Sequence, residues 1–185
     1  MKIKIIKPTP FGPVAILWSQ IDGSPKICHI LISKPELSAE DQAFSIYPHL
    51  QVSSSKKIEA LAMDIKRFLE GEDVSFSLDD LMWEQCTPFQ KSVLLAEHHI
   101  PRGSVSTYQL IARQVGVKKG ARAVGNALAN NPFPIIVPCH RAIRSDGTIG
   151  GFQGGHDMKK ALLEKEGISF HHKGRVMVPK FHYGK

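Results

Sequence analysis

The first 85 residues alternate between short apolar runs and polar turns, and this pattern predicts a small α/β unit. Lys2–Lys7 alternates apolar and charged residues in the manner of an edge strand. Residues 13–18 and 27–32 are short apolar runs bounded by Gly, Pro and Ser, which predicts two further strands. Residues 23–25 lie between these runs and predict a hairpin connection. We therefore expect a small antiparallel sheet in this part of the chain.

An amphipathic helix is predicted after these strands, over residues 56–69. Its apolar residues recur at intervals of three and four and form one stripe: Ile58, Leu61, Ala62, Ile65, Phe68 and Leu69. Gly71 follows and predicts the helix end. Residues 78–85 have the character of a connection, and the pattern changes near Cys86. We therefore place a domain boundary between residues 85 and 86.

Capping residues and periodicity predict a mainly helical second half. A helix is expected over residues 89–98, with Thr87 as its N-cap and Pro88 in its first position. Two shorter helices follow, over about 108–115 and 119–130, joined by a turn that contains Gly116. Such a pair is typical of a helix-turn-helix motif, although a plain helical hairpin has the same pattern.

The second of these short helices has two features that favour DNA binding. Lys118, Lys119 and Arg122 gather near its start, where cations and backbone N–H groups suit phosphate. Small residues line the helix and allow its backbone to approach the floor of a groove: Ala121, Ala123, Gly125, Ala127 and Ala129.

The basic charge of the chain is concentrated in the same half. Residues 1–85 contain nine Lys and Arg against twelve Asp and Glu, a net charge of −3. Residues 86–185 contain fifteen Lys and Arg against five Asp and Glu, a net charge of +10. This asymmetry indicates a polyanion, most simply nucleic acid, as the partner of the second half. A solvated basic face without a partner would have the same charge.

Composition narrows the class of protein. The chain is 42% hydrophobic and 22% charged, as is ordinary for a globular protein. The three cysteines, Cys28, Cys86 and Cys139, argue against a disulfide framework and favour a reducing, cytoplasmic location. The N-terminal segment does not have the pattern of a signal peptide, and no run approaches the ~20 apolar residues of a membrane span.

Cys139 is the strongest candidate for chemistry, because it follows an apolar run and the stiff Pro138. A cysteine nucleophile reacts as the thiolate, and the pKa of a free thiol is ~8.5. A nearby base and positive charge lower that pKa, and His140 and Arg141 are the nearest suppliers. The alternative is a buried structural thiol, the usual fate of a lone cysteine.

Adjacency in sequence restricts how His140 can act on Cys139. Neighbouring side chains of a strand point to opposite faces, so His140 reaches the thiol only at a turn or through a water molecule. A histidine that acts as a base also needs a partner for its second ring nitrogen. Glu166, at the end of a helix predicted over residues 156–165, is the candidate partner.

A series of short motifs in the second half follows the order and spacing of one known family. The motifs are Thr87-Pro88-Phe89-Gln90, Ile100-Pro101-Arg102-Gly103, Thr107-Tyr108, Arg122-Ala123-Val124-Gly125, Asn131-Pro132, Pro138-Cys139-His140-Arg141, Gly150-Gly151-Phe152 with Gly154-Gly155, and Leu162-Leu163 with Glu166-Gly167. From about residue 86 to 167 the chain resembles the O6-alkylguanine-DNA alkyltransferase family, also called methylguanine-DNA methyltransferases. The ordered set of motifs is highly specific, whereas the Pro-Cys-His-Arg segment alone is moderately so.

The resemblance implies a role for each matching residue. Cys139 would accept the alkyl group, His140 would act as a base through a water molecule, and Glu166 would orient His140. Asn131 would be the hinge before the active-site segment, Tyr108 would turn the target nucleotide out, and Arg122 would fill its place in the stack. Without the resemblance, Asn131 would be read as a turn residue, Tyr108 as a core aromatic and Arg122 as a surface charge. Further contacts to substrate and DNA are expected from Thr107, Lys118, Lys119, Ala123, Gly125, Val137, Pro138, Arg141, Ala142, Phe152 and Gln153, the last two in a lid formed by the loop 150–155.

The activity implied by the resemblance follows from where its target lies. The O6 atom of guanine lies within the base stack, so the nucleotide must be flipped out. The thiolate then attacks the alkyl carbon, and the thioether product has no route back. The resemblance thus implies an irreversible, single-turnover repair protein for O6-alkylguanine, and for O4-alkylthymine, in double-stranded DNA. It implies no cofactor and a monomer in solution, and it leaves cooperative binding on DNA open.

The resemblance also implies the fold of each domain. Residues 1–85 would form an N-terminal α/β domain with a small antiparallel sheet of ribonuclease H-like type. Residues 86–185 would form a mainly α C-terminal domain with a helix-turn-helix for DNA binding and alkyl transfer.

Four positions depart from the family pattern. Ala142-Ile143 stand where two large aliphatic residues are usual, which predicts a change of packing there. Phe152 and Gln153 stand where some members carry tyrosine and serine, which leaves open the alkyl groups that the lid accepts.

Other features of the chain predict less. Cys28-His29 is too small a ligand set for the zinc that some members hold in the first domain, so we expect no metal. Cys86 is expected to be a partly buried residue at the domain junction. The basic tail from His171 to Lys185 is expected to be solvated.

Two other functions share part of this pattern. A protein of the same fold that recognises alkylated guanine without transfer would lack the acceptor, and Cys139 is present. A cysteine hydrolase that uses Cys139, His140 and Glu166 would turn over, and it would not need a basic helix-turn-helix.

Overall fold

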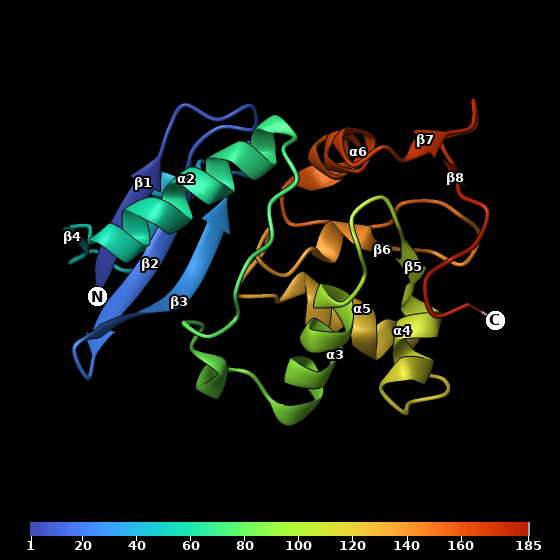
Figure 1. Ribbon diagram of the computed structural model, residues 1–185, viewed down its shortest axis with the longest axis horizontal. Coiled ribbons are helices and arrows are strands. Elements are labelled where there is room, and N and C mark those ends of the chain that lie inside the picture. Colours follow the sequence, from blue (N-terminus) through green and yellow to red (C-terminus); the bar gives the residue numbers. More distant parts are fainter. Residues whose placement is uncertain (185) are drawn as a thin grey trace. The chain divides into compact units, whose positions relative to one another are not determined.

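The computed structural model describes residues 1–184, which form two compact units (Figure 1). The first comprises Met1–Trp83 together with Pro132–Ile136, and the second comprises Glu84–Asn131 and the residues from Val137 onward. The segment Pro132–Ile136, expected in the second domain, thus belongs with the first unit. Its Pro132 carbonyl accepts a hydrogen bond from the Ile30 backbone N–H (2.8 Å), which attaches it to a strand of that unit.

The first unit contains a four-stranded mixed sheet in the order β3-β2-β1-β4. Its strands are β1 (Lys2–Ile6), β2 (Val14–Ile21), β3 (Ser24–Ile32) and β4 (Gln51–Val52). β1, β2 and β3 pair antiparallel, and a hairpin joins β2 to β3 as predicted, although its connection is at residues 22–23 rather than 23–25. The expectation of an antiparallel sheet with β1 at its edge is wrong, because β4 pairs with β1 in parallel. The two residues of β4 are exposed, so no apolar run revealed this strand.

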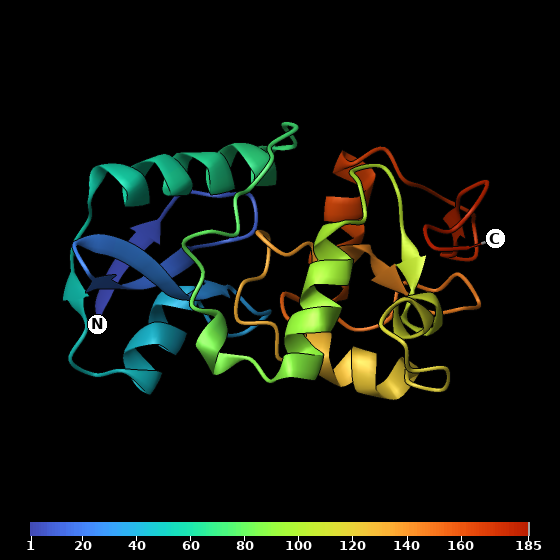
Figure 2. The same cartoon turned by 60° about the horizontal axis from the view of Figure 1, so that its bottom comes forward.

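Two helices cover the sheet. Figure 2 shows α2 (Lys56–Glu70) on one face and α1 (Ala39–Ile46) on the other. The limits of α2 agree with the predicted helix, and Gly71 ends it in the left-handed conformation (φ 108°), which a glycine adopts without strain. The sequence pattern did not predict α1, whose buried apolar residues, Ala39 and Ala43, are small and pack with residues of the sheet.

The second unit is built from the helices α3 (Pro88–His98), α4 (Tyr108–Gln114), α5 (Ala121–Ala129) and α6 (Gly155–Lys165). The predicted start of α3 is confirmed, since the Thr87 hydroxyl accepts a hydrogen bond from the Gln90 N–H (3.2 Å). α5 begins later than predicted, so Lys118 and Lys119 lie in the turn before it. That turn is tight: a Cβ atom on Gly120 would lie 2.7 Å from a Val117 methyl group.

Short pairs of strands complete the second unit. β5 (Ser106–Thr107) pairs in parallel with β6 (Ala142–Ile143), which places the start of α4 beside the segment that follows Cys139. β7 (Ser169–Phe170) pairs antiparallel with β8 (Val176–Met177). Turns of 3-10 helix lie at Trp83–Gln85 (η1) and Cys139–Arg141 (η2).

The C-terminal tail is packed rather than wholly solvated, which corrects the expectation for residues 171–185. His171 and His172 are exposed. The backbone N–H of His182, however, donates to the Val105 carbonyl (2.8 Å), and the Tyr183 hydroxyl donates to the Ala96 carbonyl (2.8 Å). Lys185 lies outside the described residues. No helix within residues 1–184 is both long and apolar enough to span a membrane.

Candidate active site

Cys139 begins a single turn of 3-10 helix at the end of a buried segment. Residues 131–143 are all buried, and η2 is closed by a hydrogen bond from the Arg141 N–H to the Pro138 carbonyl (2.8 Å). The turn removes the alternation of an extended strand, so Cys139 and His140 need not point to opposite faces. Their exposed fractions are 5% and 0%.

His140, Arg141 and Glu166 form one buried charged cluster. The Nε2 atom of His140 lies 2.9 Å from Oε1 of Glu166. Arg141 donates to both carboxylate oxygens, through Nε at 2.9 Å and Nη2 at 2.8 Å. Burial opposes ionisation of Glu166, but the hydrogen bonds and charges of His140 and Arg141 outweigh it and lower its pKa to about 2.

These contacts determine the tautomer of His140. Burial lowers the pKa of the ring, against the opposing effect of Glu166, so the imidazole is neutral at physiological pH. An ionised carboxylate only accepts hydrogen bonds, so Nε2 carries the proton and donates to Glu166. Nδ1 is then the ring nitrogen with a lone pair, and it is the atom that can take up a proton.

The surroundings of the Cys139 thiol are buried but polar. Burial raises its pKa to about 11, a hydrogen bond from the Asn131 side chain lowers it, and the charge of Glu97 raises it further. The expectation that His140 and Arg141 lower this pKa is therefore wrong for the structure without DNA, because burial of the thiol dominates and the side chains that lower its pKa are Asn131 and Lys159. Asn131 is also fixed by donation from Nδ2 to the Val137 carbonyl (3.2 Å).

Lys159 is a functional candidate that the sequence analysis did not identify. Its side chain is fully buried, and Nζ donates to the carbonyls of Ala142 (2.6 Å) and Gly151 (3.0 Å). The hydroxyl of Tyr108 lies 3.4 Å from the same nitrogen. Burial lowers the pKa of Lys159 to about 8. A lysine on the buried stripe of α6, beside Met158, is the sequence signal that would have found it.

The glycine-rich loop after β6 packs over these groups. A Cβ atom on Gly150 would lie 2.9 Å from the Tyr108 hydroxyl, so a larger residue there would displace the tyrosine. The Phe152 ring meets the His140 ring edge-on, with centroids 6.2 Å apart. Gln153 donates from Nε2 to the carbonyls of Ala129 (3.0 Å) and Asn131 (2.9 Å), which ties this loop to the end of α5.

Several residues expected to contact DNA lie on the outer side of α5 and in the turn before it. Arg122 and Ala123 are exposed, and a Cβ atom on Gly125 would meet no atom within 4 Å. Lys118 and Lys119, in the preceding turn, are exposed as well. The structure therefore places these five residues at the surface.

Other expected contact residues lie inside the protein. The Thr107 hydroxyl accepts a hydrogen bond from the Leu110 N–H (3.2 Å) and so caps α4. Arg141 is 8% exposed and holds Glu166. Val137, Pro138 and Ala142 are buried. Their carbonyl groups already accept bonds from Asn131, from the Arg141 N–H and from Lys159 respectively.

Within residues 1–184, no group of three or more His, Cys, Asp or Glu side chains is arranged to hold a metal ion. Cys28 is buried beside Met82, with the two sulfur atoms 3.2 Å apart. Cys86 is half-buried.

Comparisons with known proteins point to one family. The family profile described as "6-O-methylguanine DNA methyltransferase, DNA binding domain" matches residues 88–168. A protein of Methanosarcina acetivorans named methylated-DNA–protein-cysteine methyltransferase is 39% identical over 159 residues, which are 86% of this chain and 94% of that protein. A Methanothermobacter thermautotrophicus protein of the same name is 47% identical over 112 residues, which are 60% of this chain and 62% of the relative.

Solved structures of the same family are also similar to this chain. The chain is similar to the crystal structure of Mycobacterium tuberculosis OGT in complex with DNA, with a TM-score of 0.69 and 30% sequence identity. The superposition covers 90% of this chain and 92% of the other. The likeness therefore extends over both units.

Proposed function

The chain belongs to the O6-methylguanine-DNA methyltransferase family, and on this basis we propose that it repairs DNA by transferring the alkyl group of O6-alkylguanine to Cys139. The observation that carries the assignment to this residue is the turn η2. It holds Cys139 next to His140, whose Nε2 atom lies 2.9 Å from Glu166.

The proposed reaction is a single displacement at the alkyl carbon. The thiol proton moves to Nδ1 of His140, directly or through a water molecule, and Glu166 stabilises the imidazolium that forms. A sulfur–carbon bond then forms as the carbon–oxygen bond to guanine breaks, and the leaving guanine takes up a proton. The thioether is stable, so each molecule acts once.

The raised pKa of the thiol is consistent with this sequence of steps. A thiol with a pKa of about 11 is almost entirely protonated at neutral pH, so it does not react indiscriminately. Proton transfer to His140 would then accompany the attack, with the target base held against Tyr108 and the loop 150–155. The groups that face the base would stabilise its developing charge.

We further propose that α4 and α5 form a helix-turn-helix that binds duplex DNA through α5. The exposed Arg122 would enter the base stack as the target nucleotide leaves it, and it would offset part of the unstacking energy. Lys118 and Lys119 would contact phosphates. The first unit would be the ribonuclease H-like domain of the family.

Stoichiometry tests this proposal directly. Increasing amounts of duplex DNA that contains O6-methylguanine are incubated with a fixed amount of protein, and repaired guanine is counted. We expect repair to stop at one guanine per protein molecule. Continued turnover would contradict the proposal and favour a hydrolase that uses the same residues.

A further inference from the structure

Glu97 is a buried acid that the proposed reaction does not use. It lies on the inner side of α3, which packs against α4, α5 and η2, and its exposed fraction is 0%. Neither carboxyl oxygen makes a hydrogen bond of ordinary geometry within residues 1–184. Burial of a carboxyl group without such bonds is unfavourable, and it favours the neutral form of Glu97 over the ionised form.

The carboxyl group lies near the same backbone segment that Lys159 holds. Nζ of Lys159 donates to the Ala142 carbonyl (2.6 Å) and lies 3.4 Å from the Tyr108 hydroxyl. The backbone of Ala142 and the charge of Lys159 both act on Glu97 and favour its ionised form. An acid and a base are thus buried together behind η2, the turn that carries Cys139.

Charged and titratable groups face Glu97 from each neighbouring element. They are Lys159 from α6, Arg141 and Cys139 from η2, Tyr108 from α4 and Tyr183 from the C-terminal tail. The charged residue of α5, Arg122, is exposed. Burial raises the pKa of Glu97 to about 8, against the opposing effects of Lys159 and Arg141, whereas the pKa of the Cys139 thiol is about 11, so Glu97 becomes charged at a lower pH than the thiol.

We propose that Glu97 is a positioning residue whose buried carboxyl group, once ionised, restrains ionisation of Cys139 as the pH rises. Below about pH 8 the carboxyl is neutral and leaves the thiol unaffected. Above that pH it carries a negative charge and opposes a second negative charge on the sulfur. Glu97 does not contact the substrate, and the inference rests on the proposed function because it takes Cys139 as the acceptor.

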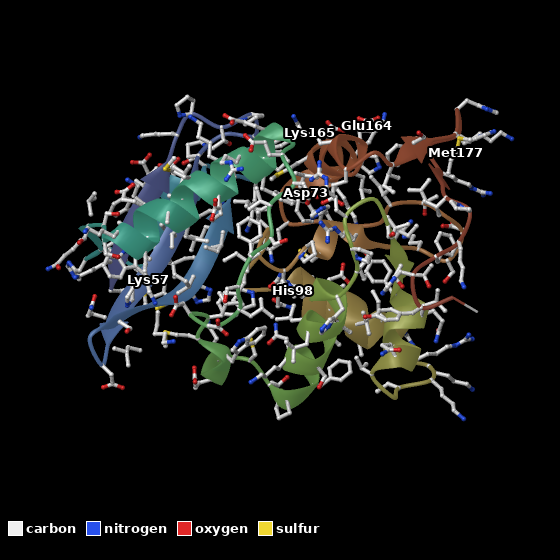
Figure 3. All side chains as sticks on the ribbon, in the orientation of Figure 1. Lys57, Asp73, His98, Glu164, Lys165 and Met177 are labelled. Atoms are coloured by element: carbon white, nitrogen blue, oxygen red, sulfur yellow. The ribbon has the colours of Figure 1, made fainter. Side chains whose placement is uncertain are left out.

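The pH profile of two reactions tests this role. Transfer from free O6-benzylguanine reports the proposed reaction without DNA. Labelling by iodoacetamide, located on the Cys139 peptide by mass spectrometry, reports thiol ionisation independently of that reaction. Both rates are measured from pH 6 to pH 9.5 for the wild type, Glu97→Gln and Glu97→Leu. Glu164→Gln is the control, since Glu164 is an exposed carboxylate on α6 (Figure 3).

We expect the three variants and the wild type to react at similar rates near pH 6.5. Near pH 9.5 both Glu97 variants should react about tenfold faster than the wild type, which corresponds to a change of one unit in the pKa of the thiol. Glu164→Gln should follow the wild type. If iodoacetamide profiles of wild type and Glu97 variants coincide, the role of Glu97 is refuted. If those profiles differ but neither a benzyl group from O6-benzylguanine nor a methyl group from duplex DNA containing O6-methylguanine is transferred to the protein, Glu97 keeps its role and the alkyl-transfer proposal fails.

Thermal unfolding of each variant accompanies these measurements. Glu97→Leu removes the charge with a side chain that needs no hydrogen-bond partner, so it provides a second test if Glu97→Gln does not fold. A pH profile that changes in only one of two folded Glu97 variants would contradict an effect of charge.

Discussion

The Nε2 atom of His140 and the Oε1 atom of Glu166 lie 2.9 Å apart, and their side chains are 0% and 1% exposed. This contact fixes the orientation of the imidazole ring and leaves Nδ1 as the basic nitrogen. Arg141 binds the same carboxylate through two nitrogens, so Glu166 supports both residues that follow Cys139.

Replacement of Glu166 by Gln should therefore affect stability and activity together. The glutamine side chain has the same shape, but Arg141 would keep a buried charge without its counter-ion. We expect the free energy of unfolding to fall by about 3 kcal/mol and alkyl transfer to slow at least about tenfold because the tautomer of His140 is no longer fixed. Urea denaturation and transfer from O6-benzylguanine measure the two effects, with Glu164→Gln as the control.

The same substitution should change the response to acid. The pKa of Glu166 is lowered from 4.5 to about 2, so its contribution to stability is present above pH 4.5 and is lost as the pH falls towards 2. In Glu166→Gln the free energy of unfolding should therefore fall less between pH 4.5 and pH 2 than in the wild type. Parallel stability curves for wild type and variant between pH 5 and pH 2 would show that the ion pair does not stabilise the fold.

Lys159→Met tests the contribution of the buried ammonium group. The charge of Lys159 lowers the pKa of the Cys139 thiol, so the variant should transfer the alkyl group at least about tenfold more slowly at pH 7. Since the pKa of Lys159 is about 8, the wild type loses this charge at higher pH. The transfer rates of the wild type and Lys159→Met should therefore become more similar by pH 9.5. Lys160→Met, at an exposed neighbouring position, is the control. Equal rates for Lys159→Met and wild type at pH 7 would exclude an electrostatic role.

Arg122→Ala separates nucleotide flipping from chemistry. Repair of duplex DNA should slow about tenfold or more, because the flipped state loses the side chain that fills the stack. Attack on free O6-benzylguanine should stay within about twofold, since no base needs to leave a stack. Rates for both substrates give the comparison, and equal losses on both would contradict a flipping role.

Lys118→Ala and Lys119→Ala address the phosphate contacts. Each should reduce the slope of log affinity against log salt concentration by about 1 and weaken binding to all duplex sequences alike. Titrations at several salt concentrations provide the measurement. A slope equal to that of the wild type would place these lysines outside the interface.

The sequence predicted elements where apolar periodicity and capping residues coincide. Thr87 and Gly71, at the ends of α3 and α2, were identified because such caps depend on local chemistry alone. β4 and the packed tail were missed because they depend on pairing with distant residues, Lys2 and Val105 among them. Local pattern contains no information on such partners.

The candidate site was predictable to a similar extent. The motif around Cys139 identified the candidate residues but left open whether a turn or a water molecule connects Cys139 and His140. The structure places the two residues in one turn and brings His140 to Glu166 across 26 positions of the chain. The lowered thiol pKa expected from His140 and Arg141 was wrong, since the sequence does not show how deeply the Cys139 thiol is buried. Glu97 and Lys159 were missed because charged residues in helices usually face solvent, and only the packing of α3 and α6 shows that these two are buried.

The mass of the intact protein after incubation with duplex DNA containing O6-methylguanine tests the central claim most directly. We predict the gain of one methyl group per molecule, located on the Cys139 peptide, and no gain in Cys139→Ala. An unchanged mass in the wild type, or a methyl group on Cys28 or Cys86 instead, would contradict the assignment.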